Sequence, residues 1–190
     1  MHFAAMLLLA YLLGSIPTGL LLARRSAQLD IRAHGSGNIG ATNVARVLGY
    51  RLGALTLLGD ALKGFAPAVL TLWWGWSIFE ASWVALAAFL GHCYSLFLKL
   101  NGGKGVAVAL GGLAALTPGM LPPVLLVWLF LYRWKRKSSL ATLLVLPLSL
   151  LALALYPPYR PAFPVVLLME LLMIWRHREN IQRLRQGREL

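Results

Sequence analysis

The chain has 190 residues, of which 59% are apolar and only 13% are charged. A soluble domain has roughly 45–50% apolar and about 25% charged residues, so this composition excludes an ordinary soluble protein. The formal net charge of +12 is also typical of nucleic-acid-binding proteins. Here, however, the basic residues flank long apolar runs, as the positive-inside rule for membrane proteins describes. We therefore expect a multi-span membrane protein that has no separate soluble domain and binds no nucleic acid.

The apolar segments approach or exceed the roughly 20 residues that a helix needs to cross a bilayer. In chain order they cover residues 3–23, 48–74, 77–98, 106–132, 140–155 and 162–175. The first segment lacks the basic start of a cleaved signal, and Arg24 and Arg25 follow it, so we expect it to be retained as a span.

The segment at residues 106–132 determines the predicted topology. It is interrupted at Thr117-Pro118-Gly119, and proline and glycine both disfavour a helix interior. If the segment were one span, the basic cluster at residues 133–137 would lie across the membrane from Lys104. If it forms two short helices, the cluster and Lys104 lie on the same side.

The distribution of charge favours two short helices. Of the 18 lysine and arginine residues, only Arg160 then lies outside, while Lys63 lies within a span. We predict an all-α integral membrane protein with seven transmembrane helices, an outside N-terminus and a cytoplasmic C-terminus. It would form a single membrane-embedded domain over residues 1–190. Residues 106–117 would make a short span of about 18 Å.

Three polar islands interrupt or follow the apolar segments, and the predicted topology places all three at the cytoplasmic face. The first island is residues 34–43, the second is residues 101–105, and the third is residues 176–180. Glycine backbones offer N–H groups, lysine and arginine offer positive charge, and both bind phosphate. We therefore predict a site for anionic substrates beside the lipid.

The first two islands resemble nucleotide-binding motifs but lack their context. The first contains G-x-G-x-x-G, yet that fingerprint needs a preceding β-strand, and here an apolar helix precedes it. It predicts instead a donor-rich loop that opens into a helix carrying Asn43 and Arg46, although an ordinary connector would have a similar composition. The second island lacks the Ser or Thr that a P-loop needs after its lysine. Lys104 on a glycine turn before a helix suits a single phosphate, and it would also suit a membrane anchor.

Two pairs of polar residues are spaced three apart, so each pair shares a helix face. Asp60 and Lys63 fall within the second apolar segment, where charged residues face the bundle interior. We leave open whether they form a structural ion pair or part of a site. His177 and Asn180 follow the last apolar segment among several arginines. A basic tail accounts for the arginines but not for this pair.

One cysteine excludes an internal disulfide and a multi-cysteine metal site. Cys93 lies within an apolar run, which is typical of a small packing residue. Its neighbour His92 is more typical of a packing or hydrogen-bonding residue than of a catalytic one. No cluster of acidic or histidine residues accompanies the glycine islands, so we expect neither a bound metal nor another cofactor.

Five motifs occur in order along the chain. They are Tyr11-Leu12-Leu13-Gly14-Ser15-Ile16-Pro17, the segment from Gly35 through Arg46, Asp60-Ala61-Leu62-Lys63-Gly64, Gly102-Gly103-Lys104-Gly105-Val106-Ala107 and Arg176-His177-Arg178-Glu179-Asn180-Ile181. Together they resemble the bacterial acyl-phosphate:glycerol-3-phosphate acyltransferases, the PlsY family.

The resemblance implies a multi-pass enzyme of the bacterial inner membrane whose active site faces the cytoplasm. Such an enzyme transfers an acyl chain from acyl phosphate to the 1-hydroxyl of glycerol 3-phosphate, giving lysophosphatidic acid and phosphate. This is the first acylation of phospholipid synthesis. The implied partners are the two substrates and membrane lipid, and no cofactor is implied.

The resemblance also implies roles for individual residues. Catalytic roles fall to His177, Asn180 and Ser36. The residues implied to bind substrate phosphate are Arg46, Lys104, Gly35, Gly37, Asn38, Gly40, Thr42, Asn43, Gly102, Gly103 and Gly105. The proton of the acceptor hydroxyl can pass to His177 or to the donor's own phosphate. Because no carboxylate is placed to orient His177 as in a catalytic triad, we favour the donor phosphate.

Two functions from other classes remain for comparison. A transporter of phosphorylated metabolites would use the same charges to line a pathway, but it needs binding groups near the membrane midplane, where Asp60 and Lys63 are the only candidates. It also commonly shows an internal repeat, and none is evident in this sequence. A structural membrane anchor would not need the glycine islands.

Overall fold

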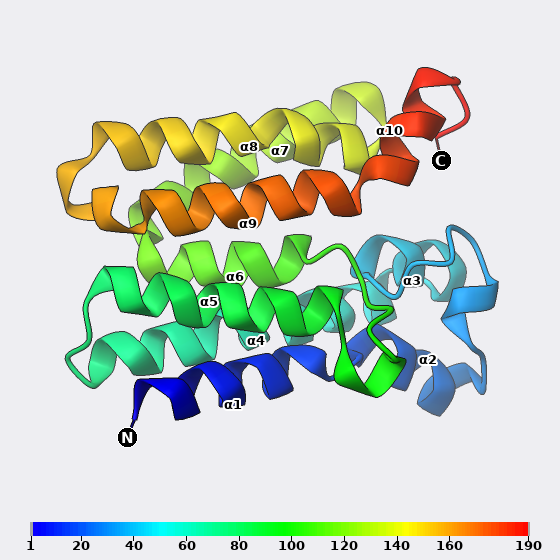
Figure 1. Ribbon diagram of the computed structural model, residues 1–190. Coiled ribbons are helices and arrows are strands. Elements are labelled where there is room, and N and C mark those ends of the chain that lie inside the picture. Colours follow the sequence, from blue (N-terminus) through cyan, green and yellow to red (C-terminus); the bar gives the residue numbers. More distant parts are fainter. Residues whose placement is uncertain (1, 190) are drawn as a thin grey trace.

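The computed structural model describes residues 2–189, and this part of the chain is helical with no β-strand. The α-helices are α1 (Phe3–Ser15), α2 (Thr18–Ala27), α3 (Ala41–Leu48), α4 (Tyr50–Trp73), α5 (Ile78–Cys93), α6 (Val106–Leu116), α7 (Leu121–Lys135), α8 (Ser138–Leu155), α9 (Phe163–Arg176) and α10 (Arg178–Arg185). Short 3-10 turns at Ile31–Ala33, Leu96–Leu98, Pro118–Met120 and Pro157–Ala162 lie between them. The long helices lie side by side along one common direction (Figure 1).

Four segments are long and apolar enough to cross a membrane: Phe3–Ala27, Tyr50–Trp73, Ile78–Leu98 and Ser138–Leu155. Helices α6, α7 and α9 are shorter, with 11, 15 and 14 residues. The predicted helix break is confirmed, because α6 ends at Leu116 and α7 begins at Leu121. The chain turns back between them, so the end of α7 returns to the side where α6 starts (Figure 1). The count of seven spans stays a prediction.

Glycines allow the central helices to pack closely. A Cβ on Gly14 of α1 would overlap the backbone of Ala88 on α5, and a Cβ on Gly91 of α5 would overlap the backbone of α1. Gly64 and Gly111 bring α4 and α6 together in the same way. Helices in a bilayer associate through such close contacts between small residues, because burial from water does not drive them together. The packing fixes the ends of these helices, where the polar islands lie.

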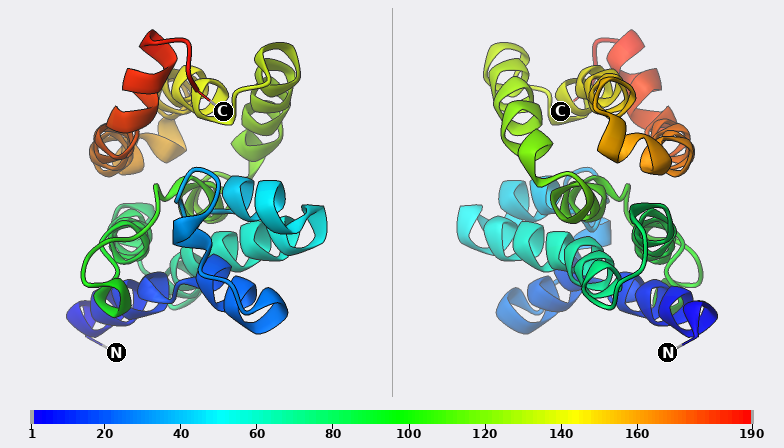
Figure 2. Two further views of the ribbon diagram at one scale, coloured as in Figure 1. Left: turned by 90° about the vertical axis from the view of Figure 1, so that its right-hand side faces the viewer. Right: turned by 90° about the vertical axis from the view of Figure 1, so that its left-hand side faces the viewer.

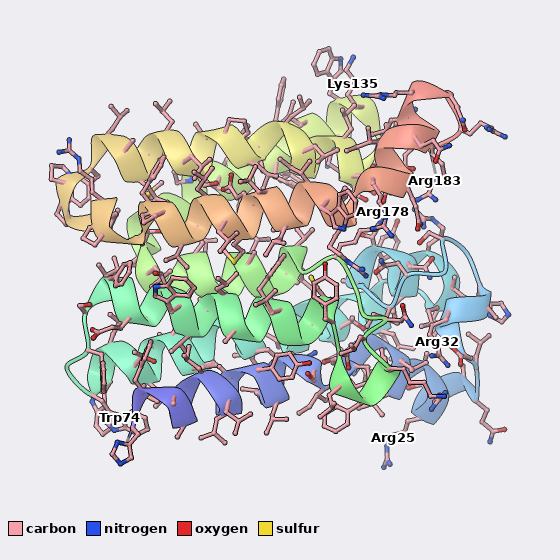
Figure 3. All side chains as sticks on the ribbon, in the orientation of Figure 1. Arg25, Arg32, Trp74, Lys135, Arg178 and Arg183 are labelled. Carbon is pink, nitrogen blue, oxygen red and sulfur yellow. The ribbon has the colours of Figure 1, made fainter. Side chains whose placement is uncertain are left out.

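The two ends of the helical bundle differ in charge. Arg25, Arg32, Lys135, Arg178 and Arg183 lie at one end, and Trp74 lies at the other (Figure 3). We call the first the basic end. The loop before α3, the loop before α6 and the junction of α9 with α10 all lie there (Figure 1). The three polar islands therefore share one end of the molecule, as the sequence predicts.

Candidate active site

The first island is organised around the buried side chain of Asn43. Asn43 Oδ1 accepts a hydrogen bond from the backbone N–H of Ser36 at 2.8 Å. Its Nδ2 donates to the carbonyl oxygens of His34 and Asn38 at 3.0 and 2.9 Å. Asn38 Oδ1 in turn accepts from the N–H of Gly40 at 2.8 Å. These side chains fix the loop from within, which leaves its exposed edge to face a ligand.

Glycine is required at two positions of this island. Gly35 and Gly37 have φ angles of +60° and +71°, in the left-handed region that other residues rarely adopt. A Cβ on Gly35 would also overlap Asn43 Oδ1. Helix α3 then carries Arg46, an exposed side chain whose Nη1 lies 3.5 Å from the same oxygen. Thr42 is exposed at the start of α3. Arg46 and Thr42 thus stand beside the loop at the basic end.

The second island packs directly on the end of α5. The N–H groups of Gly102 and Gly103 donate to the carbonyl oxygens of Cys93 and His92 at 3.1 and 3.0 Å. A Cβ on Gly103 would overlap the imidazole of His92. Gly105, with a φ angle of +80°, ends the island where α6 begins. In this conformation the two N–H groups are engaged within the protein, and the glycines permit close packing.

Arg176 joins the third island to the second. Its Nε and Nη2 donate to the carbonyl oxygens of Gly103 and Gly102 at 3.1 and 2.9 Å. Its guanidinium also lies 5.3 Å from the centre of the Tyr94 ring, a distance at which a cation is attracted to an aromatic face. The sequence places Arg176 in the third island and in a basic tail. The structure adds that its guanidinium holds the glycine island in place.

The intramembrane charges lie beneath the second island. Asp60 Oδ1 is 2.5 Å from Lys63 Nζ and 3.7 Å from His92 Nδ1, and all three side chains are buried. Lys63 also donates to the carbonyl oxygen of Ile16 at 2.5 Å. The predicted shared face and interior position of Asp60 and Lys63 are confirmed. The His92 ring thus lies between this ion pair and Gly103.

Lys104 is the cation of the second island, and it is half-buried. Burial lowers the pKa of its ammonium group to about 8. The carboxylates of Glu189 and Glu179 oppose that shift, whereas the positive charges of Arg183 and Arg176 add to it. Lys104 is therefore mostly charged at neutral pH and poorly hydrated. Both properties favour a charge-assisted contact with an anion.

His177 and Asn180 offer two buried hydrogen-bond acceptors. His177 Nδ1 lies 2.8 Å from the carbonyl oxygen of Met173, so Nδ1 carries the proton and Nε2 has a free lone pair. Burial lowers the pKa of His177 to about 4, which keeps the ring neutral. Asn180 Nδ2 donates to Glu189 Oε1 at 2.5 Å. Its Oδ1 is buried and has no hydrogen-bond partner among residues 2–189. The pair is thus suited to bind hydroxyl groups.

Glu189 is a site residue that the sequence analysis missed. Its side chain is only 6% exposed. Besides Asn180, it accepts from Ser139 Oγ at 2.6 Å and from Arg183 Nε at 3.0 Å. Burial alone would raise the pKa of this carboxyl, but the three hydrogen bonds outweigh burial and lower it. Because a carboxylate can only accept hydrogen bonds, Glu189 fixes the Asn180 amide with Oδ1 turned away from it.

An apolar cavity extends from the second island into the bundle. It lies between α6, α7, α8 and α9 and encloses about 520 Å³ of empty space, part of it open to the outside. Val106, at the start of α6, lines the end of the cavity next to the second island. Leu113, Trp128 and Val166 line the part further from that island. The end-on views show these four helices around the same region (Figure 2).

The predicted site residues thus fall into two groups at the basic end. Lys104, His177 and Asn180 gather around Glu189, and the charges of Lys104 and Glu189 both act on His177. The first island, with Ser36 and Arg46, lies at the same end on the side of α3 (Figure 1). The sequence motifs contain the residues of both groups, but they predict neither this division nor the cavity beside it.

A model of the glycerol-3-phosphate acyltransferase family matches residues 4–187. A relative from Pseudomonas paraeruginosa (strain DSM 24068 / PA7), named glycerol-3-phosphate acyltransferase, is 46% identical over 185 residues, which cover 96% of this chain and 95% of the relative. A relative of the same name from Azotobacter vinelandii is 44% identical over 182 residues, with 96% and 95% coverage.

Two solved structures have the same fold. Both are crystal structures of PlsY, an integral membrane glycerol 3-phosphate acyltransferase. The glycerol 3-phosphate form has a TM-score of 0.94 and 40% identity, and the lysophosphatidic acid form has a TM-score of 0.92 and 39% identity. Each match covers 99% of this chain and 94% of the other. The chain therefore belongs to the glycerol-3-phosphate acyltransferase family of integral membrane proteins, the PlsY family.

Proposed function

We propose that this protein transfers an acyl chain from acyl phosphate to the 1-hydroxyl of glycerol 3-phosphate, giving lysophosphatidic acid and phosphate. One observation carries the proposal: a cationic site and an apolar cavity meet at the start of α6. Lys104 belongs to the first, and Val106, two residues later, belongs to the second. An acyl phosphate has the matching form, with an anionic head on an apolar chain. The forms in which the solved relatives were crystallised support the acceptor and the product.

The phosphate groups of both substrates are assigned to the cations and donors of the islands. Lys104 supplies a poorly hydrated charge, Ser36 is half-buried in the first island, and Arg46 is exposed on α3 beside it. The hydroxyl groups of the glycerol are donors, and they need acceptors. His177 Nε2 and Asn180 Oδ1 meet that need, because both are acceptors on buried side chains, one at the junction of α9 with α10 and the other in the first turn of α10. A buried acceptor without a donor costs about 1–3 kcal/mol, which donation from the substrate would recover.

The reaction follows from this placement. The 1-hydroxyl oxygen attacks the acyl carbonyl carbon, the bond from that carbon to the phosphate oxygen breaks, and inorganic phosphate leaves. The hydroxyl proton passes to the departing phosphate. Lys104 stabilises the negative charge that develops during the transfer. Holding donor and acceptor in line can lower the barrier by several kcal/mol. A His177 with a pKa of about 4 is a weak base at neutral pH, so the donor phosphate takes that role.

The test supplies purified protein with acyl phosphate and glycerol 3-phosphate and measures released phosphate and the lipid product. We expect equal amounts of phosphate and lysophosphatidic acid. Acyl thioesters of coenzyme A and of acyl carrier protein serve as control donors and should give no product. Product from the thioesters alone would show that the donor is wrong. Uptake of glycerol 3-phosphate into sealed vesicles, without acylation, would favour a transporter.

We further propose that the single domain spans the inner membrane seven times, with the basic end in the cytoplasm and the N-terminus outside. The accumulation of lysine and arginine at one end supports this orientation. Single cysteines at Ser36, Asn101 and Gln186, in a Cys93→Ala background, should react only with a label applied from the cytoplasmic side. Reaction of the cysteine at Gln186 with an impermeant label applied outside would contradict the topology.

A further inference from the structure

A polar pair interrupts the wall of the apolar cavity. Ser149 Oγ of α8 lies 2.5 Å from Glu170 Oε1 of α9 and 2.8 Å from the carbonyl oxygen of Leu146. Glu170 and Ser149 are 4% and 6% exposed, and both line the cavity. No lysine, arginine or histidine forms an ion pair with Glu170 in the part of the chain that is described. An acid inside a span is costly and marks a functional position more often than a structural one.

The hydrogen bonds leave one oxygen of this pair without a partner. Ser149 has a single hydroxyl proton, which it gives either to Leu146 or to Glu170. In the first case Oε1 of Glu170 must carry a proton and donate it to Ser149 Oγ, and in the second case Oε1 accepts, so Oε2 has no part in either. Within residues 2–189, Oε2 makes no hydrogen bond to another side chain or to the backbone. The cavity wall therefore carries a polar atom that only a ligand or a water molecule can satisfy.

The distance from His177 to the Ser149–Glu170 pair can be compared with the length of an acyl chain. Glu170 lies seven residues before His177, which is about 10 Å along the helix at 1.5 Å per residue. An extended chain advances about 1.2 Å per bond, since three backbone bonds span at most 3.6 Å. An acyl chain whose carbonyl carbon lies beside Lys104 and His177 would therefore reach Glu170 at about its eighth bond.

We propose that Glu170, held by Ser149, determines which acyl chains this protein accepts, by disfavouring saturated chains long enough to pass it. The proposal rests on the acyl transfer proposed above and assigns the chain selectivity of that site. A long saturated chain places methylene groups against Oε2 and excludes water from it, so a buried polar atom stays unpaired. A chain that ends before the pair leaves room for a water molecule to bind there.

The test compares saturated acyl phosphates of 8 and 16 carbons by their kcat/KM values. Replacing Glu170 by Leu removes the polar atom and keeps an apolar side chain of similar size. Each methylene group that moves into apolar surroundings increases affinity about fourfold. If two or more methylene groups of the long chain face this position, the ratio of 16-carbon to 8-carbon kcat/KM should be about tenfold or more higher in Glu170→Leu than in the unmodified protein. Glu170→Gln is the matched control, because it keeps the shape and a polar group, and its ratio should stay near that of the unmodified protein.

Two outcomes distinguish the inference from the function beneath it. If Glu170→Leu stays active but its chain-length ratio does not change, the selectivity role is refuted and the acyl transfer stands. If the unmodified protein transfers no chain from any acyl phosphate, both are refuted. Glu170→Met is a second apolar variant in case Glu170→Leu does not fold, and the same rise in ratio is expected from it.

Discussion

His177 offers the sharpest test of how the acceptor hydroxyl is bound and deprotonated. Its Nδ1–H is committed to the carbonyl oxygen of Met173 at 2.8 Å, so only Nε2 can meet the substrate. With a pKa of about 4, the ring is almost entirely neutral at pH 7. It can accept a hydrogen bond there, but it is poorly matched to remove a proton, because a general base works best when its pKa is near the operating pH.

We expect replacement of His177 by Asn to weaken binding more than turnover. The variant loses one hydrogen bond to a neutral group, of order 0.5–1.5 kcal/mol, which is about two- to thirteenfold in the KM for glycerol 3-phosphate. The longer side chain of His177→Gln places an amide oxygen near the position of Nε2, so it should recover much of that loss. General-base catalysis by His177 would instead make its removal cost about 10²–10⁴-fold in kcat.

The dependence of kcat/KM on pH provides a separate measurement. A phosphate monoester titrates near pH 6, so a step from the substrate is expected there in both the unmodified protein and His177→Asn. A neutral histidine adds no step of its own between pH 5.5 and 8. A kcat loss above a hundredfold with unchanged KM, together with loss of a pH step in His177→Asn, would refute our assignment and identify His177 as the base.

Two further predictions concern the charges around this residue. Because the ammonium pKa of Lys104 is about 8 in the substrate-free protein, the KM for glycerol 3-phosphate should rise as the pH passes above 8. The Lys104→Arg variant stays charged, so its KM should not rise in this way. The Lys104→Gln variant should lose about ten- to a hundredfold in kcat/KM. Full activity of Lys104→Gln would rule out the contact between Lys104 and phosphate. Glu189→Gln should raise the same KM about tenfold by releasing Asn180 and Arg183. Glu179 is exposed and close in sequence to Asn180, so Glu179→Gln is the control. If both variants raise this KM equally, Glu189 acts only through its charge and not through its hydrogen bonds.

Much of this fold can be predicted from the sequence because the signals are local. The apolar segments, the break at Pro118 and the one-sided distribution of lysine and arginine each depend on a short stretch of chain. The shared helix face of Asp60 and Lys63 follows from their spacing and is confirmed, and the structure adds that Lys63 Nζ lies 2.5 Å from Asp60 Oδ1. The sharing of one end by the three islands follows from the break and the charges together, and the structure confirms it as well.

The site contacts depend on segments far apart in the chain, which spacing cannot reveal. The glycines of the second island predict free N–H groups for phosphate, but whether such a group is free depends on the chain opposite. Here the end of α5 supplies acceptors to Gly102 and Gly103. Their carbonyl oxygens turn toward Arg176, which follows more than seventy residues later. The direct assignment of phosphate to these two glycines therefore stays a prediction, and the structure supports Lys104 more strongly.

Glu189 shows why composition alone misleads at the basic end. In the sequence it is one acid in an arginine-rich tail, where a solvated position is the ordinary expectation. In the structure its side chain is buried beside Lys104, Asn180 and Arg183, and its charge offsets part of the repulsion between Lys104 and Arg183. Because it accepts from the Asn180 amide nitrogen, it leaves the amide oxygen free for a hydroxyl. Positive charge and neutral acceptors thus lie next to each other in the structure, and this arrangement suits the proposed substrate, which carries a phosphate and hydroxyl groups.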